Sequence, residues 1–501
     1  MTCNRIVCLL TVCFLIGGCG FHTGSGGRKQ PADSPDFAKL MAMQVSAAAL
    51  TPLENVDIQY RDVPFITKDD TVSIRPIRIY LPAGTSGPVP VVFVPHYEMK
   101  EDALELRSYL DEGWAVVSPS GFEDRYNGQL TDDDLVFNNA VLYAIRHDDR
   151  FDPERILLVG GSAGGYMTMM LNALQMGICA SVAKSPIQNT YFNFYRHFSA
   201  ARDLNKKAWV KFMLKNGRKL SKGTPEEKTQ ALMEAMQSLP FPILGLISGL
   251  FEPILENFPD KEDTARWEAL SPVGLGDCYT SPFLVWHCTS DLLVPVDQTS
   301  RRFTYANNGK SMPRRFSTRL DPGYPGHLGC SLEEVLPPDQ TFVANLALSQ
   351  ADSVMTAVYD PGRAFNINIV DDGPVESYGG HSSMIPTRDV DVLPYLRVMV
   401  ARSLKRTEVL RPEKLRLLLD RYLGASVQLP AHEGVDDTVY GSPAIYRQEA
   451  QEELAYYAKR HSLDEVDQMA ASLEDERLLG TWEQIKADYF PDINSEGVLP
   501  N

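Results

Sequence analysis

A Gly-x-Ser-x-Gly pattern placed directly after an apolar run constrains this chain more than any other feature. Residues 156–159 are Ile, Leu, Leu and Val, and Ser162 follows between Gly160 and Gly164. A serine on such a strand-to-helix turn is pushed out of the sheet, and the glycines leave room for strained backbone and close packing. The pattern predicts a strand, a sharp turn that exposes the Ser162 hydroxyl, and a helix that begins near Ala163. An ordinary Gly/Ser turn is the alternative, and the flanking strand and helix patterns speak against it.

The surrounding sequence alternates apolar strands with helical stretches. An antiparallel hairpin is expected first, over residues 55–82. The expected strands that follow are 89–94, 114–117, 156–159, 180–183 and 283–286, with helices at 101–112 and 132–147. This alternation is typical of a mostly parallel sheet flanked by helices on both faces. We therefore predict an α/β fold with its chemistry at the carboxyl ends of the strands.

The expected main domain covers residues 55–407 and contains two insertions. Residues 187–275 are largely helical and are predicted to form a lid over Ser162, with a capping box at Thr224 to Glu227. Residues 314–362 are predicted to be a β-rich insertion beside the substrate cleft. Residues 408–501 form a charged helical C-terminal extension that is expected to pack on the main domain.

A serine hydroxyl needs a base to take its proton and an acid to orient that base. In folds with this turn the order along the chain is Ser, then Asp or Glu, then His. Asp291 lies in the loop just after the expected strand 283–286, where such an acid belongs. We predict Asp291 as the acid.

Two histidines compete for the role of the base. His327 follows Asp291 by 36 residues, which is the more ordinary spacing. His381 follows a strand-like run at 365–370 and a Gly-Gly loop, and a helical pattern over 390–404 comes after it. This local order favours His381, and His327 stays open as the alternate base.

An oxyanion hole needs two hydrogen-bond donors. The N–H of Ala163, the residue after the nucleophile, is one expected donor. The second should come from the loop after strand 89–94, which holds His96 and Tyr97 in place of a glycine-rich segment. Side-chain donors can serve there, so both the hydroxyl and the N–H of Tyr97 are candidates.

The N-terminus reads as a targeting segment. Arg5, the apolar residues 6–16 and the small residues before Cys19 make a secretory signal that is too short to span a membrane. It resembles a bacterial lipoprotein signal, which implies a signal peptide over residues 1–18 and a lipid on Cys19; an ordinary signal cleaved elsewhere is the alternative. Residues 19–54 then form a tether and a short helix, and the chain is expected at the bacterial cell envelope.

Charge and cysteines narrow the choice of partners. The formal charge of −17 over 501 residues argues against nucleic acid or anionic lipid as a partner. Besides Cys19, the cysteines after the signal are Cys179, Cys278, Cys288 and Cys330, and we expect most to be buried and free. Their spacing fits no metal site, and no cofactor is expected.

Several of these segments resemble the catalytic domain of the prolyl oligopeptidase family of α/β-hydrolases. The resemblance is carried by residues 152–156, 160–166 and 287–295, and by the run 79–84 ahead of the first central strand. It implies an α/β-hydrolase fold and serine hydrolysis through an acyl-enzyme. No long β-propeller region precedes these segments, and the usual His-Gly pair is replaced by His96 and Tyr97, which moves the expectation from peptidase toward esterase.

Three functions follow from this sequence, in order of preference. The first is a serine hydrolase that cleaves a carboxylic ester, and the alternative is a serine peptidase of aminoacyl or dipeptidyl type. The expected substrate is thus a small-molecule ester or a peptide. A non-catalytic binding lipoprotein on the same fold is the third reading.

Overall fold

The structure is a computed structural model of the chain. It describes residues 53, 55–120, 130, 132–197, 206–222, 224, 227, 231, 259–289, 291, 294–303, 324, 326–347, 359–371, 392–402, 410–427, 438–460 and 462–490. The predicted signal, Cys19, nearly all of the tether and His381 lie outside these residues, as do parts of the lid and of the β-rich insertion. In the described part, no helix combines the length and apolarity needed to cross a bilayer.

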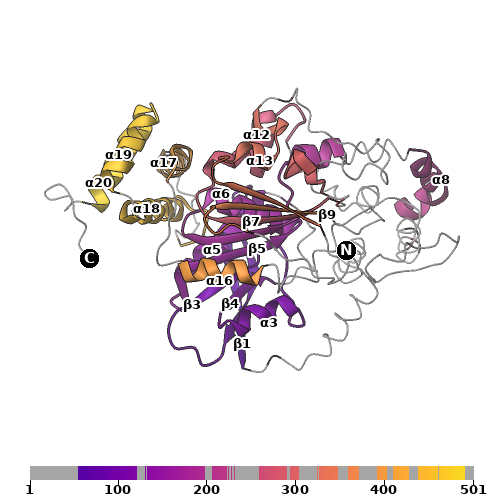
Figure 1. The fold of residues 1–501 in the computed structure, drawn as a ribbon, viewed down its shortest axis with the longest axis horizontal. Helices are drawn as coiled ribbons and strands as arrows, with labels where there is room; N and C mark the ends of the chain where they lie inside the picture. Colours follow the sequence, from indigo (N-terminus) through magenta and orange to yellow (C-terminus); the bar gives the residue numbers. More distant parts are fainter. Residues whose placement is uncertain are drawn as a thin grey trace.

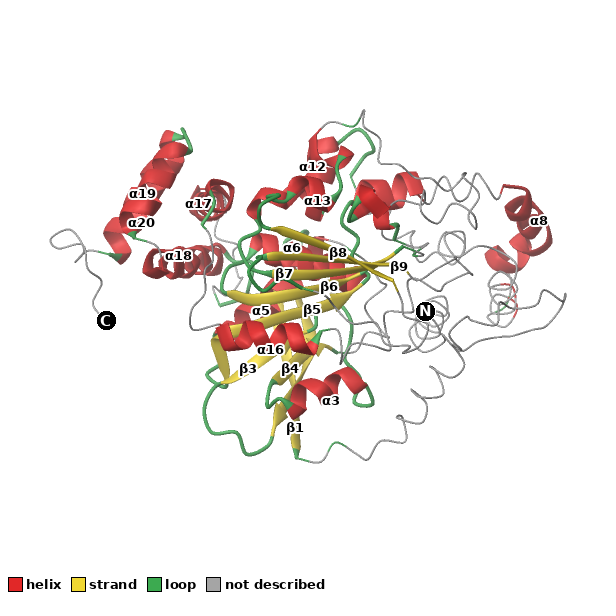
Figure 2. Cartoon of the chain, in the orientation of Figure 1, coloured by secondary structure: helices red, strands yellow, loops and turns green. Residues whose placement is uncertain are grey.

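One nine-stranded sheet occupies the centre of the molecule (Figure 2). Its strands are β1 (Val56–Ile66), β2 (Val72–Pro82), β3 (Val89–Phe93), β4 (Ala115–Pro119), β5 (Phe151–Gly161), β6 (Ile178–Lys184), β7 (Phe283–Cys288), β8 (Thr341–Ala347) and β9 (Phe365–Asp371). They lie in the order β1-β2-β4-β3-β5-β6-β7-β9-β8. The β1–β2 and β2–β4 pairs are antiparallel and all later pairs are parallel. This is the strand order of the α/β-hydrolase fold, so the predicted fold class is confirmed.

Helices and short helical turns surround the sheet (Figure 1). The α-helices are α3 (Leu104–Asp111), α5 (Asp132–Arg146), α6 (Ala163–Leu174), α8 (Lys206–Lys222), α12 (Thr264–Ala269), α13 (Leu332–Val335), α16 (Leu393–Arg402), α17 (Pro412–Val427), α18 (Pro443–Arg460), α19 (Leu463–Ser472) and α20 (Glu476–Tyr489). The tighter or wider turns are η1 (Phe192–His197), η2 (Pro272–Cys278), η3 (Val296–Gln298), η4 (Arg301–Phe303) and η6 (Gly326–Gly329).

Both faces of the sheet are buried, because neighbouring strand residues point to opposite sides. Val91 and Leu158 belong to a core with residues of α5 and α6, whereas Val92 and Leu157 belong to a core with residues of α3 and α16. The continuous apolar runs of the sequence therefore mark strands that are covered twice.

Two details of the sheet go beyond the prediction. Strand β5 begins at Phe151, well before the expected strand 156–159, and its pairing with β3 has a register irregularity between Phe151 and Ile156. The described strand of the β-rich insertion, β8, extends the edge of the main sheet beside β9.

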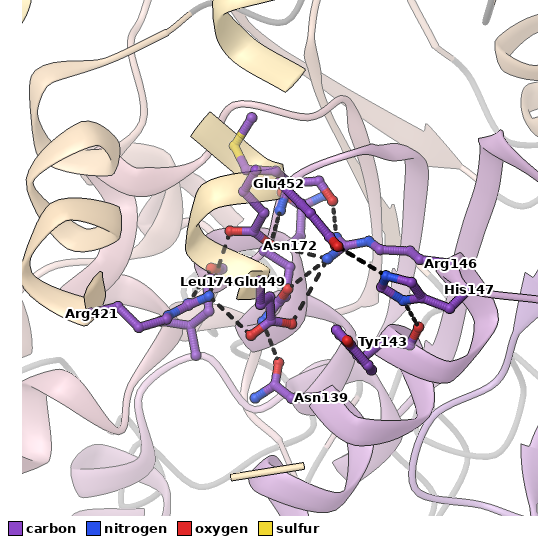
Figure 3. A network of polar contacts seen from close by, with 12 residues as sticks. Asn139, Tyr143, Arg146, His147, Asn172, Leu174, Arg421, Glu449 and Glu452 are labelled. Carbon is purple, nitrogen blue, oxygen red and sulfur yellow. Dashed lines mark hydrogen bonds and ion pairs between the residues drawn. The ribbon is translucent and has the colours of Figure 1, made fainter. Parts of the chain in front are cut away.

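The C-terminal helices pack on the main domain, as expected. A buried ion network joins them to α5 (Figure 3): Arg146 lies 3.0 Å from Glu453 and 3.9 Å from Glu449. The N–H of Ile66, at the end of β1, also donates to the carbonyl of Tyr440 at 2.8 Å. The extension is therefore anchored by polar contacts as well as by its own apolar core.

The burial of the cysteines and the capping box at Thr224 to Glu227 match the predictions from the sequence. Cys179, Cys278 and Cys288 are buried thiols, and Cys330 is a half-buried thiol, with no disulfide among these four. In the predicted capping box, the N–H of Thr224 donates to the Glu227 carboxylate and the N–H of Glu227 donates to the Thr224 hydroxyl.

Candidate functional site

Ser162 occupies the sharp turn between β5 and α6. Its φ of 55° and ψ of −120° are a conformation that non-glycine residues rarely adopt. The Ser162 N–H donates to the carbonyl of Lys184 at 2.8 Å, which ties the turn to the end of β6. The residue is only half-buried, and its side chain does not cap the helix that begins at Ala163. The hydroxyl is therefore held at the carboxyl edge of the sheet without being used by the fold.

The flanking glycines are required by close contacts. A Cβ at Gly160 would lie 2.2 Å from the carbonyl oxygen of Gly164 and would clash with α6. A Cβ at Gly164 would lie 3.0 Å from the carbonyl of Pro95 and 3.2 Å from the Tyr97 ring. The glycines thus bring both the helix and the loop after β3 close to Ser162.

Tyr97 reaches Ser162 from that loop. Its hydroxyl is hydrogen-bonded to the Ser162 side chain and accepts a hydrogen bond from the Ala163 N–H. Burial raises the pKa of Tyr97 to about 12, against the opposing effect of these two hydrogen bonds, so the phenol stays protonated at neutral pH. The Tyr97 N–H donates to the Pro95 carbonyl at 3.0 Å. Of the two predicted donors of Tyr97, the hydroxyl is therefore the one that lies at Ser162.

His96 ties the loop after β3 to α5. It has a φ of 74°, and its N–H donates to the Asn138 side chain of α5 at 3.2 Å. Burial, together with the nearby charge of Arg75, lowers the pKa of His96 to about 4, so the ring is neutral. Asn138 was not predicted from the sequence, although an amide in the middle of a buried helix face was a usable signal.

Asp291 follows β7 and is fully buried. One carboxylate oxygen accepts the Val294 N–H at 2.9 Å, and the other lies 3.7 Å from Nε2 of His287. Val294 packs in the same apolar cluster as Ala163. The loop that carries the predicted acid is therefore packed into the same apolar core as the start of α6.

The sequence gives no indication of a role for His287, because the order Ser, acid, His points to histidines after Asp291. Its Nε2–H donates to the Val294 carbonyl at 2.7 Å, and its Nδ1 accepts the Thr299 hydroxyl at 2.6 Å. Both ring nitrogens are thus engaged in holding the acid loop. His287 positions the loop and has no nitrogen left for Ser162.

Of the two candidate bases, the structure describes His327 but not His381. His327 lies on η6 with its Nε2 3.9 Å from the Asp277 carboxylate, and its N–H donates to Glu268 at 2.7 Å. The carboxylate that His327 approaches is therefore that of Asp277 and not that of Asp291. His381 lies outside the described residues, while β9 before it and α16 after it lie where the sequence predicted them. The base stays a prediction.

Comparison with known proteins gives structural neighbours of low similarity. No family model matches the chain, and no curated protein is similar to it. A puromycin-hydrolyzing peptidase of Mycobacterium tuberculosis matches at 16% identity over 70% of this chain and 40% of its own, with a TM-score of 0.37.

Two further solved structures match to a similar extent. An acylaminoacyl peptidase of Pyrococcus horikoshii matches at 16% identity over 76% of this chain and 46% of its own, with a TM-score of 0.39. Oligopeptidase B of Leishmania major matches at 13% identity over 69% and 37%, with a TM-score of 0.35. The chain spans less than half the length of these proteins, and overlaps of this size assign no activity.

Proposed function

We propose that this protein is a serine hydrolase with Ser162 as its nucleophile. One observation carries the proposal: a strained, half-exposed serine meets a protonated tyrosine hydroxyl and the first N–H of a helix at the carboxyl edge of the sheet. Strain that the fold does not need is typical of functional sites.

The proposed reaction proceeds through an acyl-enzyme on Ser162. The Ser162 oxygen attacks the acyl carbon while an imidazole removes its proton. Negative charge develops on the carbonyl oxygen, and the Ala163 N–H and the Tyr97 O–H donate to it. The same imidazole then gives its proton to the leaving group, and water releases the acyl group from Ser162 by the reverse route. Asp291 orients the imidazole and stabilises its charged form.

Labelling by a fluorophosphonate probe tests the nucleophile. We expect the full chain to form one covalent adduct, located on Ser162 by mass spectrometry. The Ser162→Ala variant should keep the fold and lose the adduct. An intact wild-type chain that takes up no probe would instead support the non-catalytic binding protein.

The base is tested by comparing His381→Ala with His327→Ala. We propose His381, so only the first change should abolish turnover and probe labelling. His327 contacts Asp277, and its loss should leave both within a few-fold of wild type. The opposite result would make His327 the base.

The bond that is cleaved is the finer part of the proposal. The sequence favoured an ester, yet the solved structures named above are peptidases, so we rank a peptide substrate first and an ester second. Turnover of aminoacyl and dipeptidyl amides, compared with chromogenic acyl esters of matched acyl groups, decides the order. Hydrolysis of esters with no amide turnover would make an ester the first-ranked substrate again.

We also propose that a lipid on Cys19 holds the chain at the bacterial cell envelope. The signal-like residues 1–18 support this location. Metabolic labelling with a fatty-acid analogue should mark the wild-type chain and leave Cys19→Ser unmarked. Equal labelling of the two would contradict the proposal.

A further inference from the structure

Helix α8 carries a charge pattern that the whole chain does not share. Its 17 residues, Lys206–Lys222, contain seven Lys or Arg and no Asp or Glu. The complete chain has a net charge of −17. Total charge argued against anionic lipid as a partner, but α8 is a strongly cationic element within an acidic protein.

The described side chains of α8 form stripes along the helix, because residues three or four apart share a face. Phe212 is 5% exposed and Asn216 is fully buried, so one face is packed. Val210 and Leu214 lie on the opposite face and are 44% and 84% exposed. The helix therefore presents an apolar stripe to solvent in addition to its packed one.

This apolar stripe is unusual for the described surface. The described residues include six large hydrophobic side chains that are more than a third exposed, and three of them lie on α8. The six are Tyr60, Val72, Ile74, Val210, Met213 and Leu214. Helix α8 also lies at the side of the molecule opposite α17 to α20 (Figure 1).

Cations lie directly beside the stripe. Lys211 and Lys215 are exposed and four residues apart, and Lys219 and Lys222 continue the row. A helix with an apolar stripe next to a row of lysines has the form of an interfacial helix that lies flat on a membrane.

We propose that α8 binds the surface of an anionic lipid bilayer. The lysine row meets the headgroup phosphates, and Leu214 and Val210 enter the boundary between headgroups and acyl chains. Nucleic acid would satisfy the charges, but its backbone offers the exposed leucine and valine no apolar partner. This binding needs neither the chemistry at Ser162 nor a lipid on Cys19.

Vesicles test the proposal with the full chain. The wild-type protein should bind phosphatidylglycerol vesicles, bind pure phosphatidylcholine vesicles much more weakly, and lose affinity as salt rises. Amide hydrogen exchange over residues 206–222 should slow when phosphatidylglycerol vesicles are added. A segment that exchanges at the same rate with and without vesicles would overturn the proposal, whatever the N-terminus contributes to binding.

Two double variants of α8 are each compared with a control double variant elsewhere on the surface. Val210→Ser with Leu214→Ser should weaken vesicle binding about tenfold or more. Val72→Ser with Ile74→Ser, which removes similar exposed apolar area from β2, should not. Lys211→Gln with Lys222→Gln should weaken binding about tenfold at low salt.

The matched charge control removes exposed lysines remote in sequence from α8. Lys100→Gln with Lys261→Gln should leave vesicle affinity within about two-fold, and Ser162→Ala should leave it unchanged. Equal losses in the α8 variants and their controls, or tighter binding of a DNA duplex than of anionic vesicles, would overturn the proposal.

Discussion

Helix α6 ends in two different ways. At its N-terminal end, the strained Ser162, the Ala163 N–H and the Tyr97 hydroxyl meet at the edge of the sheet. At its C-terminal end, the last carbonyls are covered by cations. Lys414 donates to Asn172, Ala173 and Gln175, Arg421 donates to Leu174, and Arg146 donates to Met176.

The difference separates function from stability within one helix. A helix leaves its first N–H groups and its last carbonyls without intrahelical partners. In α6, the Ala163 N–H lies at the proposed site, where a substrate would meet it. The last carbonyls instead accept hydrogen bonds from side chains of the protein. Two of the three cations come from the C-terminal extension, on α17. We therefore expect changes at the first end to alter turnover and changes at the second to alter the free energy of unfolding.

Replacing the nucleophile gives the largest expected effect. Ser162→Ala should lower kcat by at least about ten-thousand-fold, since the variant lacks the attacking oxygen. The free energy of unfolding should change by less than about 1 kcal/mol, because the Ser162 side chain caps nothing. Kinetics and denaturant unfolding of the same preparation check both. A kcat that falls less than tenfold would show that Ser162 is not the nucleophile, and the N-terminal end of α6 would lose its catalytic role.

Tyr97→Phe removes a hydroxyl from the same end. We expect kcat to fall about 10²- to 10³-fold with little change in KM, since the lost hydrogen bond forms with the transition-state oxyanion. Tyr109→Phe is the control, because that hydroxyl donates to Glu105 at 2.9 Å on the opposite face of the sheet. A KM effect without a kcat effect would place Tyr97 in substrate binding instead.

Lys414→Met tests the other end. The substitution keeps the length of a fully buried side chain and removes the donor to three carbonyls. It should lower the free energy of unfolding by about 3 kcal/mol and leave kcat within a few-fold at a temperature where the variant is folded.

The exposed Arg447 supplies the comparison for that measurement. Arg447→Met, on the neighbouring α18, should cost less than about 0.5 kcal/mol. If the folded Lys414→Met protein turned over tenfold more slowly, the two ends of α6 would be coupled and the separation would be wrong.

A pH experiment tests how the buried Glu449, near the C-terminal end of α6, contributes to the free energy of unfolding. Glu449 lies between Arg421 and Arg146, and burial raises its pKa to about 7. The folded protein therefore binds a proton that the unfolded chain releases near pH 4.5, so this stabilisation is complete at low pH and is lost as pH rises through about 7.

Glu449→Gln should remove that dependence. Between about pH 5 and pH 8, wild type should lose about 2 kcal/mol more stability than the variant. Denaturant unfolding at both pH values measures the difference. Parallel pH profiles for the two proteins would mean that Arg421 and Arg146 keep the carboxylate charged throughout.

The sequence predicts features that depend on neighbouring residues better than contacts between residues far apart in the chain. The strands, the Ser162 turn and the Asp291 loop were predictable because apolar runs and glycines act on their own neighbours. The contacts of Lys414 were not, since they join residues more than 230 positions apart and a lysine ordinarily reads as a surface charge. The net charge of −17 likewise concealed the cationic α8. His381 remains a prediction from its flanking strand and helix.

The smallest expected effect concerns the strain itself. Ser162→Gly puts the one residue that tolerates a φ of 55° at the turn. We expect the free energy of unfolding to rise by about 1 kcal/mol relative to Ser162→Ala, which keeps a Cβ in the strained conformation. Both variants lack the nucleophile, so any difference between their melting temperatures reports the backbone alone. If glycine did not raise the melting temperature, the turn would be held without strain, and the link between its geometry and catalysis would lose its physical basis.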